Sequence, residues 1–188
     1  MSKVFSEFEL DQFAVKFHGE TSAAYNPMNC VGSMEEALES KTVTKSCRGV
    51  VVKTRSRGTG TGTLNISAHV PMDIYNSAYG MELDSLIDGV KAYGRNSVHK
   101  PFSAVAHVMD EDGVEKYKAY PNCIMTAGVS RKIENGTEEV AELELEISIM
   151  PDDFGNGMYE ALADDLDESV KNKWMNAFTP DIVQVATV

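Results

Sequence analysis

The segment from Ala141 to Ile149 constrains the fold most, because apolar and polar side chains alternate along it without a break. Such alternation is typical of a β-strand with one face packed and the other open. Each branched side chain on the packed face gains about 1.5 to 3 kcal/mol from burial. The opposite face carries carboxylates about 7 Å apart, and this face needs water or a partner. These carboxylates are Glu142, Glu144 and Glu146.

Two further segments predict strands, and two short motifs predict the turns between strands. Thr63–Val70 alternates in the same way, and Pro101–Met109 is a similar run that ends in the sequence DEDG. Asp-Gly between extended segments indicates a tight hairpin, because both residues tolerate positive φ. Asn135 and Gly136 predict the tip of a second hairpin. Strands at this spacing indicate a mainly antiparallel β-sandwich or barrel.

Two segments have helical spacing of their apolar residues. A short helix is expected to begin after Pro71 and to end at Gly80 or Gly89. A second helical segment is expected within residues 157–178, where Leu162 and Trp174 belong to a series four residues apart. We expect one domain over residues 1–188, with a short flanking α-helix and a C-terminal helical or extended segment at about 157–188.

Charge is distributed unevenly along the chain. The net charge is −12, which argues against ordinary nucleic-acid binding. Between Ser40 and Met72, however, there are six bases and no acid, so the remainder of the chain has 11 bases and 29 acids. A basic segment and an acidic remainder suit a head-to-tail contact between identical copies. The alternative is that these charges only keep the protein soluble.

The basic segment is expected to form a long hairpin at about residues 48–66, with a mobile tip rich in Gly, Ser, Thr and Arg. Its sequence RGTGTGT, from Arg57 to Thr63, resembles a phosphate loop in composition. A phosphate loop, however, needs Lys-Ser/Thr after the glycines and a helix behind them. Here a predicted strand follows, so we expect a loop tip that becomes ordered against a partner.

No residue pattern predicts catalysis, a metal site or a cofactor. The four histidines lie in separate segments, and the aspartates near the C-terminus do not match a calcium loop. Cys30, Cys47 and Cys123 lack metal-ligand spacing and are expected to be buried. No apolar segment is long enough to span a membrane, and the acidic N-terminus does not match a signal peptide. We therefore expect a protein that is not an enzyme and is made in the cytoplasm.

Three segments, in their order and in their residue patterns, resemble the major tail proteins, or tail tube proteins, of long-tailed phages that infect low-GC Gram-positive bacteria. The segments are MDIYNSAYGMELDSLIDGVKAYG, DEDGVEKYKAYPNCIMTAGVSRKIENGTEEVAELELEISIMPDDFGNGMYEAL and KNKWMNAFTPDIV. The likeness runs from about Pro71 to Val183. It implies a β-sandwich that assembles into hexameric rings, which stack into the tail tube of the virion.

The resemblance also implies roles for particular residues and partners. The long hairpin is the loop that reaches a neighbouring ring, which gives Arg48, Lys53, Arg55 and Arg57 a role in stacking. Partners are other copies of the chain and, by the same resemblance, the tape measure protein and the tail terminator or baseplate proteins. DNA passes through the tube during infection without specific binding.

In such a tube, Glu142, Glu144 and Glu146 are expected to face the bore. DNA carries one negative charge per roughly 1.7 Å of axis. A bore lined with carboxylates repels these charges, so the DNA can slide through without binding. Two alternatives stay open. The carboxylates could simply face outside solvent, and the protein could be a monomeric β-sandwich module that binds a small ligand or a carbohydrate through exposed aromatic residues.

Overall fold

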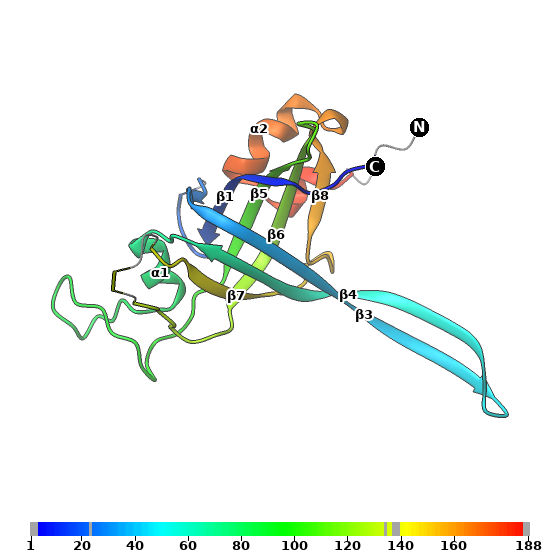
Figure 1. The fold of residues 1–188 in the computed structure, drawn as a ribbon, viewed down its shortest axis with the longest axis horizontal. Helices are drawn as coiled ribbons and strands as arrows, with labels where there is room; N and C mark the ends of the chain where they lie inside the picture. Colours follow the sequence, from blue (N-terminus) through cyan, green and yellow to red (C-terminus); the bar gives the residue numbers. More distant parts are fainter. Residues whose placement is uncertain (1–3, 23, 134, 137–139, 186–188) are drawn as a thin grey trace.

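The computed structural model describes residues 4–22, 24–133, 135–136 and 140–185. Within these ranges the chain forms eight antiparallel strands and two α-helices, which confirms the mainly β sandwich-like fold (Figure 1). The strands are β1 Glu9–Phe17, β2 Asn26–Pro27, β3 Val31–Cys47, β4 Val50–Ala68, β5 Phe102–Met109, β6 Glu115–Met125, β7 Leu143–Ile149 and β8 Tyr159–Leu162. The helices are α1 Met72–Ala78 and α2 Glu168–Ala177, with short 3-10 turns at Ala163–Asp165 and Pro180–Val183.

Strand β6 joins two walls of the sandwich. Its first half pairs with β8 and its last three residues pair with β7, while β5 lies along its other edge. The register with β5 shifts between these halves, at Pro121 and Asn122 of β6. A proline lacks the N–H that a ladder needs, so this irregularity lets the strand bend. One wall is therefore β2-β1-β5-β6-β8, and the other is β6-β7-β4-β3.

The main core lies between these walls. Leu145 and Ile147 of β7 and Leu64 and Ile66 of β4 are all at most 2% exposed, as the alternation in their sequences predicted. They pack against Phe13 and other apolar residues of the opposite wall. Helix α1 adds Ile74, Tyr75 and Ala78 to the same core. It begins after Pro71 and ends before Gly80, whose φ is +60°, as expected from the sequence.

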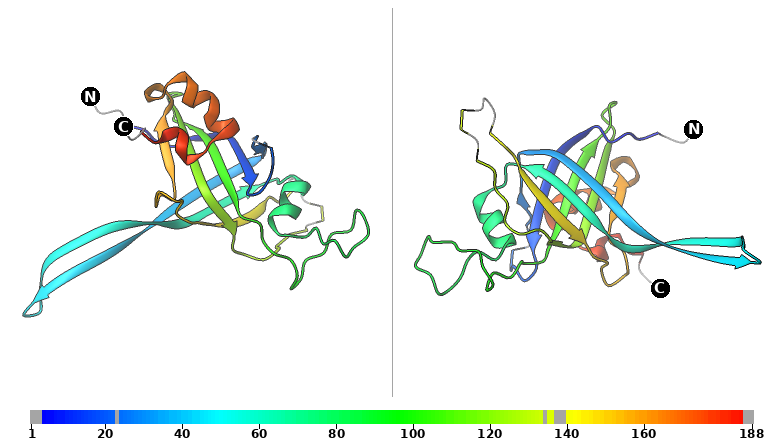
Figure 2. Two further views of the ribbon diagram at one scale, coloured as in Figure 1. Left: turned by 180° about the vertical axis from the view of Figure 1, so that it is seen from behind. Right: turned by 60° about the horizontal axis from the view of Figure 1, so that its bottom comes forward.

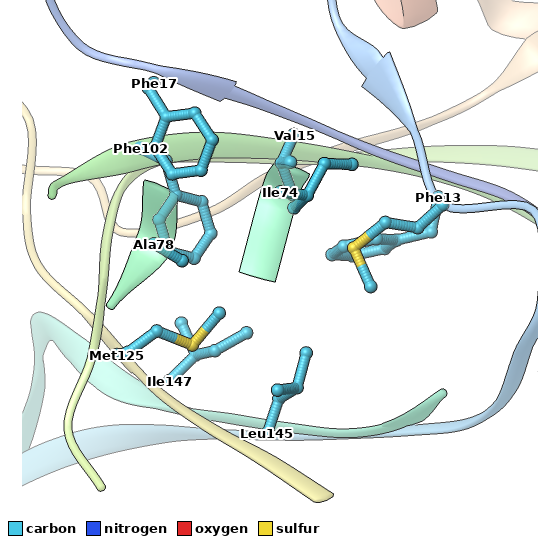
Figure 3. Close-up of a pocket in the computed structure, with 10 residues that line it drawn as sticks. Phe13, Val15, Phe17, Ile74, Ala78, Phe102, Met125, Leu145 and Ile147 are labelled. Atoms are coloured by element: carbon cyan, nitrogen blue, oxygen red, sulfur yellow. The ribbon is translucent and has the colours of Figure 1, made fainter. Parts of the chain in front are cut away.

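Packing in this core is nearly complete. A void of about 10 Å³ remains between α1 and the two walls (Figure 3). Its lining is entirely apolar and includes Phe102, Ile74 and Leu145. A dry apolar void of this size is barely the volume needed for one water molecule. This void is therefore too small for a small-molecule ligand.

A second apolar cluster covers the outer face of the β1-β5-β6 wall. Trp174 and Phe178 pack there against Val105 and Ala119, and α2 lies over these strands (Figures 1 and 2). The Trp174 indole Nε1–H donates a hydrogen bond to the Lys118 carbonyl at 3.1 Å. Of the predicted helical segment 157–178, only Glu168–Ala177 forms an α-helix, because residues 159–162 pair with β6 as β8.

The expected boundaries of the long hairpin are wrong. Residues 50–68 form one continuous strand, β4, and its hairpin partner is β3, from Val31 to Cys47. The tip is therefore at Arg48 and Gly49, and the glycine-rich sequence after Arg57 is paired strand instead of a mobile tip. The inner half of β4 is held between β3 and β7. This pairing stabilises a strand in which the glycines alone would favour a loop.

Two smaller expectations also need correction. The turn at Asn135 and Gly136 lies between antiparallel strands, but β6 and β7 pair over only three residues, from Cys123 to Met125 in β6. Cys123 is buried, whereas Cys30 and Cys47 are exposed. By contrast, the hairpin at DEDG is confirmed, because Gly113 has φ +78° and the Asp110 carboxylate accepts the Val114 N–H at 2.7 Å.

Candidate interaction surfaces

The outer parts of β3 and β4 form an arm that projects from the sandwich. We define the arm as residues 37–59, all of which are exposed. It extends away from the rest of the molecule in each view of the ribbon (Figures 1 and 2). A two-stranded ribbon without other support is at best marginally stable in water. The arm of an isolated copy therefore gains little stability from burial.

The register of the arm separates its charges onto one face. Lys41 is opposite Arg57, Val43 is opposite Arg55, and Lys45 is opposite Lys53. Register partners and alternate residues share a face of a strand pair. Five of these six side chains are cations, and we call this surface the basic face.

The other face of the arm is neutral and rich in hydroxyl groups. Thr42 is opposite Ser56, and Thr44 is opposite Thr54. The Thr42 hydroxyl donates to the Ser56 hydroxyl at 3.1 Å. The arm is therefore a one-sided cationic ribbon, and the sequence alone predicted its charge but not which face carries it.

The tip of the arm combines a strained turn with apolar residues. Arg48 and Gly49 both have positive φ, +48° and +81°. Two consecutive residues with positive φ form the tight hairpin turn whose twist matches that of the strands. This conformation is unfavourable for Arg48, because it brings a Cβ atom close to the backbone. Val50, Val51 and Val52 follow the turn and are 56% to 65% exposed. The four predicted stacking residues, Arg48, Lys53, Arg55 and Arg57, are thus spread along the arm, and Arg48 lies at its tip.

The predicted acidic strand lies on the outer face of the β3-β4-β7 wall. Glu146 is opposite Asn65, which in turn is opposite Glu35. In the next row, Glu144 is opposite Ser67, and Ser67 is opposite Ser33. Glu35, Glu144 and Glu146 are exposed, and the positions between them are uncharged. We call this surface the carboxylate face, and Glu35 is a member of it that the sequence alone did not indicate.

Glu142 has a different environment from the other two predicted carboxylates. It precedes β7 and accepts a hydrogen bond from the Ser67 hydroxyl at 2.6 Å. Its carboxylate also lies against the backbone of Gly32 in β3. Glu142 therefore fastens the beginning of β7 to the beginning of β3, and it lies at the edge of the carboxylate face.

A buried lysine fixes the base of the arm to the sandwich. Lys118 of β6 is fully buried, donates to Glu36 of β3, and lies 2.5 Å from the Glu7 carboxylate. Tyr120 donates to the same Glu36 carboxylate. This network holds β3 and the segment before β1 against β6. It thereby sets the direction in which β3 leaves the sandwich.

The pKa values of this network follow from its partners. Burial lowers the pKa of Lys118, but its hydrogen bonds with Glu36 and Glu7 outweigh burial, so the pKa lies above its usual value. For Glu7, burial raises the pKa, yet the hydrogen bond and charge of Lys118 bring it below its usual value. Burial and the neighbouring Glu36 raise the pKa of Tyr120. Lys118 is therefore charged and Glu7 ionised at neutral pH.

No candidate metal centre is present among the residues that the structure describes, and the tryptophan is buried. No group of three His, Cys, Asp or Glu side chains in the described ranges could hold a metal ion. His107 Nδ1 lies 2.9 Å from Asp11 Oδ2, which ties β5 to β1. Trp174, the single tryptophan, is 1% exposed and cannot stack on a sugar. In the same described part, no helix is long and apolar enough to cross a membrane.

No protein-family model and no curated protein matches this chain. Among solved structures, the chain is similar to the tube-terminating cap of the anti-feeding prophage. The two share 11% sequence identity with a TM-score of 0.46, and the alignment covers 86% of this chain and 97% of the cap chain. A TM-score of 0.46 is too low to assign this chain the fold or the role of the cap protein.

Proposed function

We propose that this chain is a non-catalytic structural protein of a phage tail, which assembles with copies of itself into stacked rings around a bore. The proposal rests on the charge and the exposure of the arm. The arm holds six bases and one acid, Glu39, its residues are all exposed, and the rest of the chain has 11 bases and 28 acids. A surface of one sign on an extended arm and the opposite sign on the body favours contact between unlike surfaces of two copies.

A heterologous contact of this kind repeats, because each copy still offers one free arm and one free acidic surface. Repetition gives rings where the rotation closes and filaments where it does not. Six copies per ring, and a tape measure protein and a terminator or baseplate protein as partners in the virion tail, are part of the proposal from the family resemblance alone.

The carboxylate face is proposed to line the bore. Of the two walls of the sandwich, the one formed by β1, β5 and β6 is covered by α2, whereas the outer face of β3, β4 and β7 carries Glu35, Glu144 and Glu146 in the open. A lining of carboxylates repels the phosphates of passing DNA. The genome then moves through the tube without binding to it.

Self-assembly of the purified protein tests this proposal. We expect rings or tubes in negative-stain micrographs and large species in light scattering as the concentration rises at low salt. High salt should weaken assembly, because exposed charges are screened beyond about 10 Å at 0.1 M. A protein that stays monomeric at high concentration and low salt would overturn the proposal and favour a monomeric binding module.

A pair of charge-reversal variants tests the role of the arm. Arg55→Glu/Arg57→Glu should abolish assembly, while circular dichroism stays unchanged because both side chains are exposed. Arg95→Glu/Lys173→Glu is the matched control, since both residues are exposed basic residues outside the arm. This control changes the net charge equally and should still assemble. Equal assembly of the two variants would contradict a stacking role for the arm.

A further inference from the structure

A groove between the two walls of the sandwich is complementary to the tip of the arm. It lies between the beginning of β1 and the beginning of β3 and has a volume of about 250 Å³. Leu10, Met34 and Val108 form apolar parts of its lining, Glu9 supplies a carboxylate, and Glu7 supplies another that is already paired with Lys118. We call it the seam groove, because it is where the sheet fails to close on itself.

Two strand edges beside the groove, in β3 and at the beginning of β1, have no partner strand among the described residues. β3 is the last strand in the sheet order, so its outer edge has no partner strand among the described residues. β2 pairs with β1 only at Ala14 and Val15, which leaves Glu9 and Leu10 without a partner on that side. Unpaired strand edges offer backbone donors and acceptors to another chain. Glu142 adds a third carboxylate where it lies against Gly32.

The tip of the arm matches this groove in both polarity and charge. Val50, Val51 and Val52 are exposed apolar residues, and they are flanked by Arg48 and Lys53. Apolar side chains that enter an apolar groove gain roughly 25 cal/mol per Å² of buried apolar surface. Cations beside the rim carboxylates orient the contact and exclude wrong partners. We infer that the arm tip of one copy docks into the seam groove of a second copy.

The occupant must be a second copy, because β3 itself carries both sites. Ser33 lines the groove and Cys47 stands at the tip, on the same strand. At about 3.3 Å per residue, the 14 steps along the strand from Ser33 to Cys47 keep the sites about 45 Å apart. An arm therefore cannot reach the groove of its own chain. The same length sets an upper limit of about 45 Å on the spacing between successive copies.

Disulfide trapping tests this docking with a cysteine that the chain already has at the tip. Ser33→Cys in a Cys30→Ser background places a thiol in the groove, opposite the native Cys47 of a docked copy. Burial raises the pKa of the Cys123 thiol, so that side chain stays unreactive. A disulfide needs Cα atoms within about 7 Å, so a link within one chain is excluded. Mild oxidation of the assembled protein should give a ladder of linked oligomers, which additional Cys47→Ser should abolish.

Two comparisons separate this inference from the proposed function on which it rests. Glu146→Cys in the same Cys30→Ser background places the thiol on the carboxylate face, and it should give no ladder. A ladder from Glu146→Cys but none from Ser33→Cys would overturn groove docking and assign the arm to the carboxylate face. Tubes without a ladder from either variant would also overturn it, while leaving self-assembly standing. Absence of all assembly would overturn both.

Discussion

Lys41 lies directly opposite Arg57 across the two strands of the arm, and Lys45 lies opposite Lys53 in the same register. Like charges in directly opposed positions destabilise a strand pair, by a fraction of a kcal/mol to about 1 kcal/mol. The arm of an isolated copy is therefore weakened by the same side chains that suit it to an acidic partner. In the proposed assembly, contact with an acidic surface would relieve this repulsion.

Reversing one member of that pair should have opposite effects on the arm and on assembly. Arg57→Glu creates an opposite-charge pair with Lys41, so amide hydrogen exchange in the arm of the monomer should slow by up to about fivefold, the equivalent of about 1 kcal/mol. Assembly, measured by light scattering, should weaken in the same variant. Arg57→Gln, which removes the repulsion without adding attraction, should give an intermediate exchange rate. Faster exchange in Arg57→Glu would contradict the electrostatic explanation.

Reversing the carboxylate face should make the bore retain DNA. Glu144→Lys/Glu146→Lys leaves the buried side of β7 unchanged, so tubes should still form. Added lysines attract phosphates, and DNA bound inside the tube should be protected from nuclease at low salt. Glu111→Lys/Asp112→Lys, in the exposed β5–β6 turn, is the matched control. DNA on the face variant that stays nuclease-sensitive would place this face on the exterior.

Acid should release the segment before β1. The pKa of Glu7 lies below its ordinary value of 4.5, because Lys118 and Lys116 outweigh the effect of burial. The folded state thus favours the carboxylate, whose contribution is complete above about pH 4.5 and is lost as the pH falls through the lower folded value. Hydrogen exchange of the amides near Phe8, corrected for its intrinsic pH dependence, should accelerate over that range. Glu7→Gln should show fast exchange already at neutral pH, whereas Glu9→Gln should resemble the unmodified protein.

Two glycines with similar backbone conformations should respond differently to alanine. Gly80 has φ +60°, and a Cβ there would lie 2.1 Å from the Val98 carbonyl oxygen. Gly89 has φ +86°, but no atom lies within 4 Å of its Cβ position. Gly89→Ala should cost only the conformational penalty, about 1 to 2 kcal/mol. Gly80→Ala should cost more, measured by urea unfolding, and an equal loss would show that the contact with Val98 relaxes freely.

Local pattern was enough to predict several parts of this protein. Alternation in Thr63–Val70 and in the segment after Ala141 predicted which side chains are buried, because period-two burial is a property of the strand itself. Turn chemistry predicted the hairpin at DEDG, and Pro71 with Gly80 predicted the limits of α1. The excess of bases between Ser40 and Met72 likewise needed no structure to be recognised.

Tertiary structure decided which strands pair and where charges face. Residues 34–39 read MEEALE, which favours a helix by composition. They form β3 instead, because β4 pairs along them, and pairing between distant segments leaves no local signal. For the same reason, the sequence could not place the hairpin tip at Arg48, gather five cations on one face, or bury Lys118 between Glu7 and Glu36. Those outcomes depend on register between strands, where a shift of one residue moves every side chain to the opposite face.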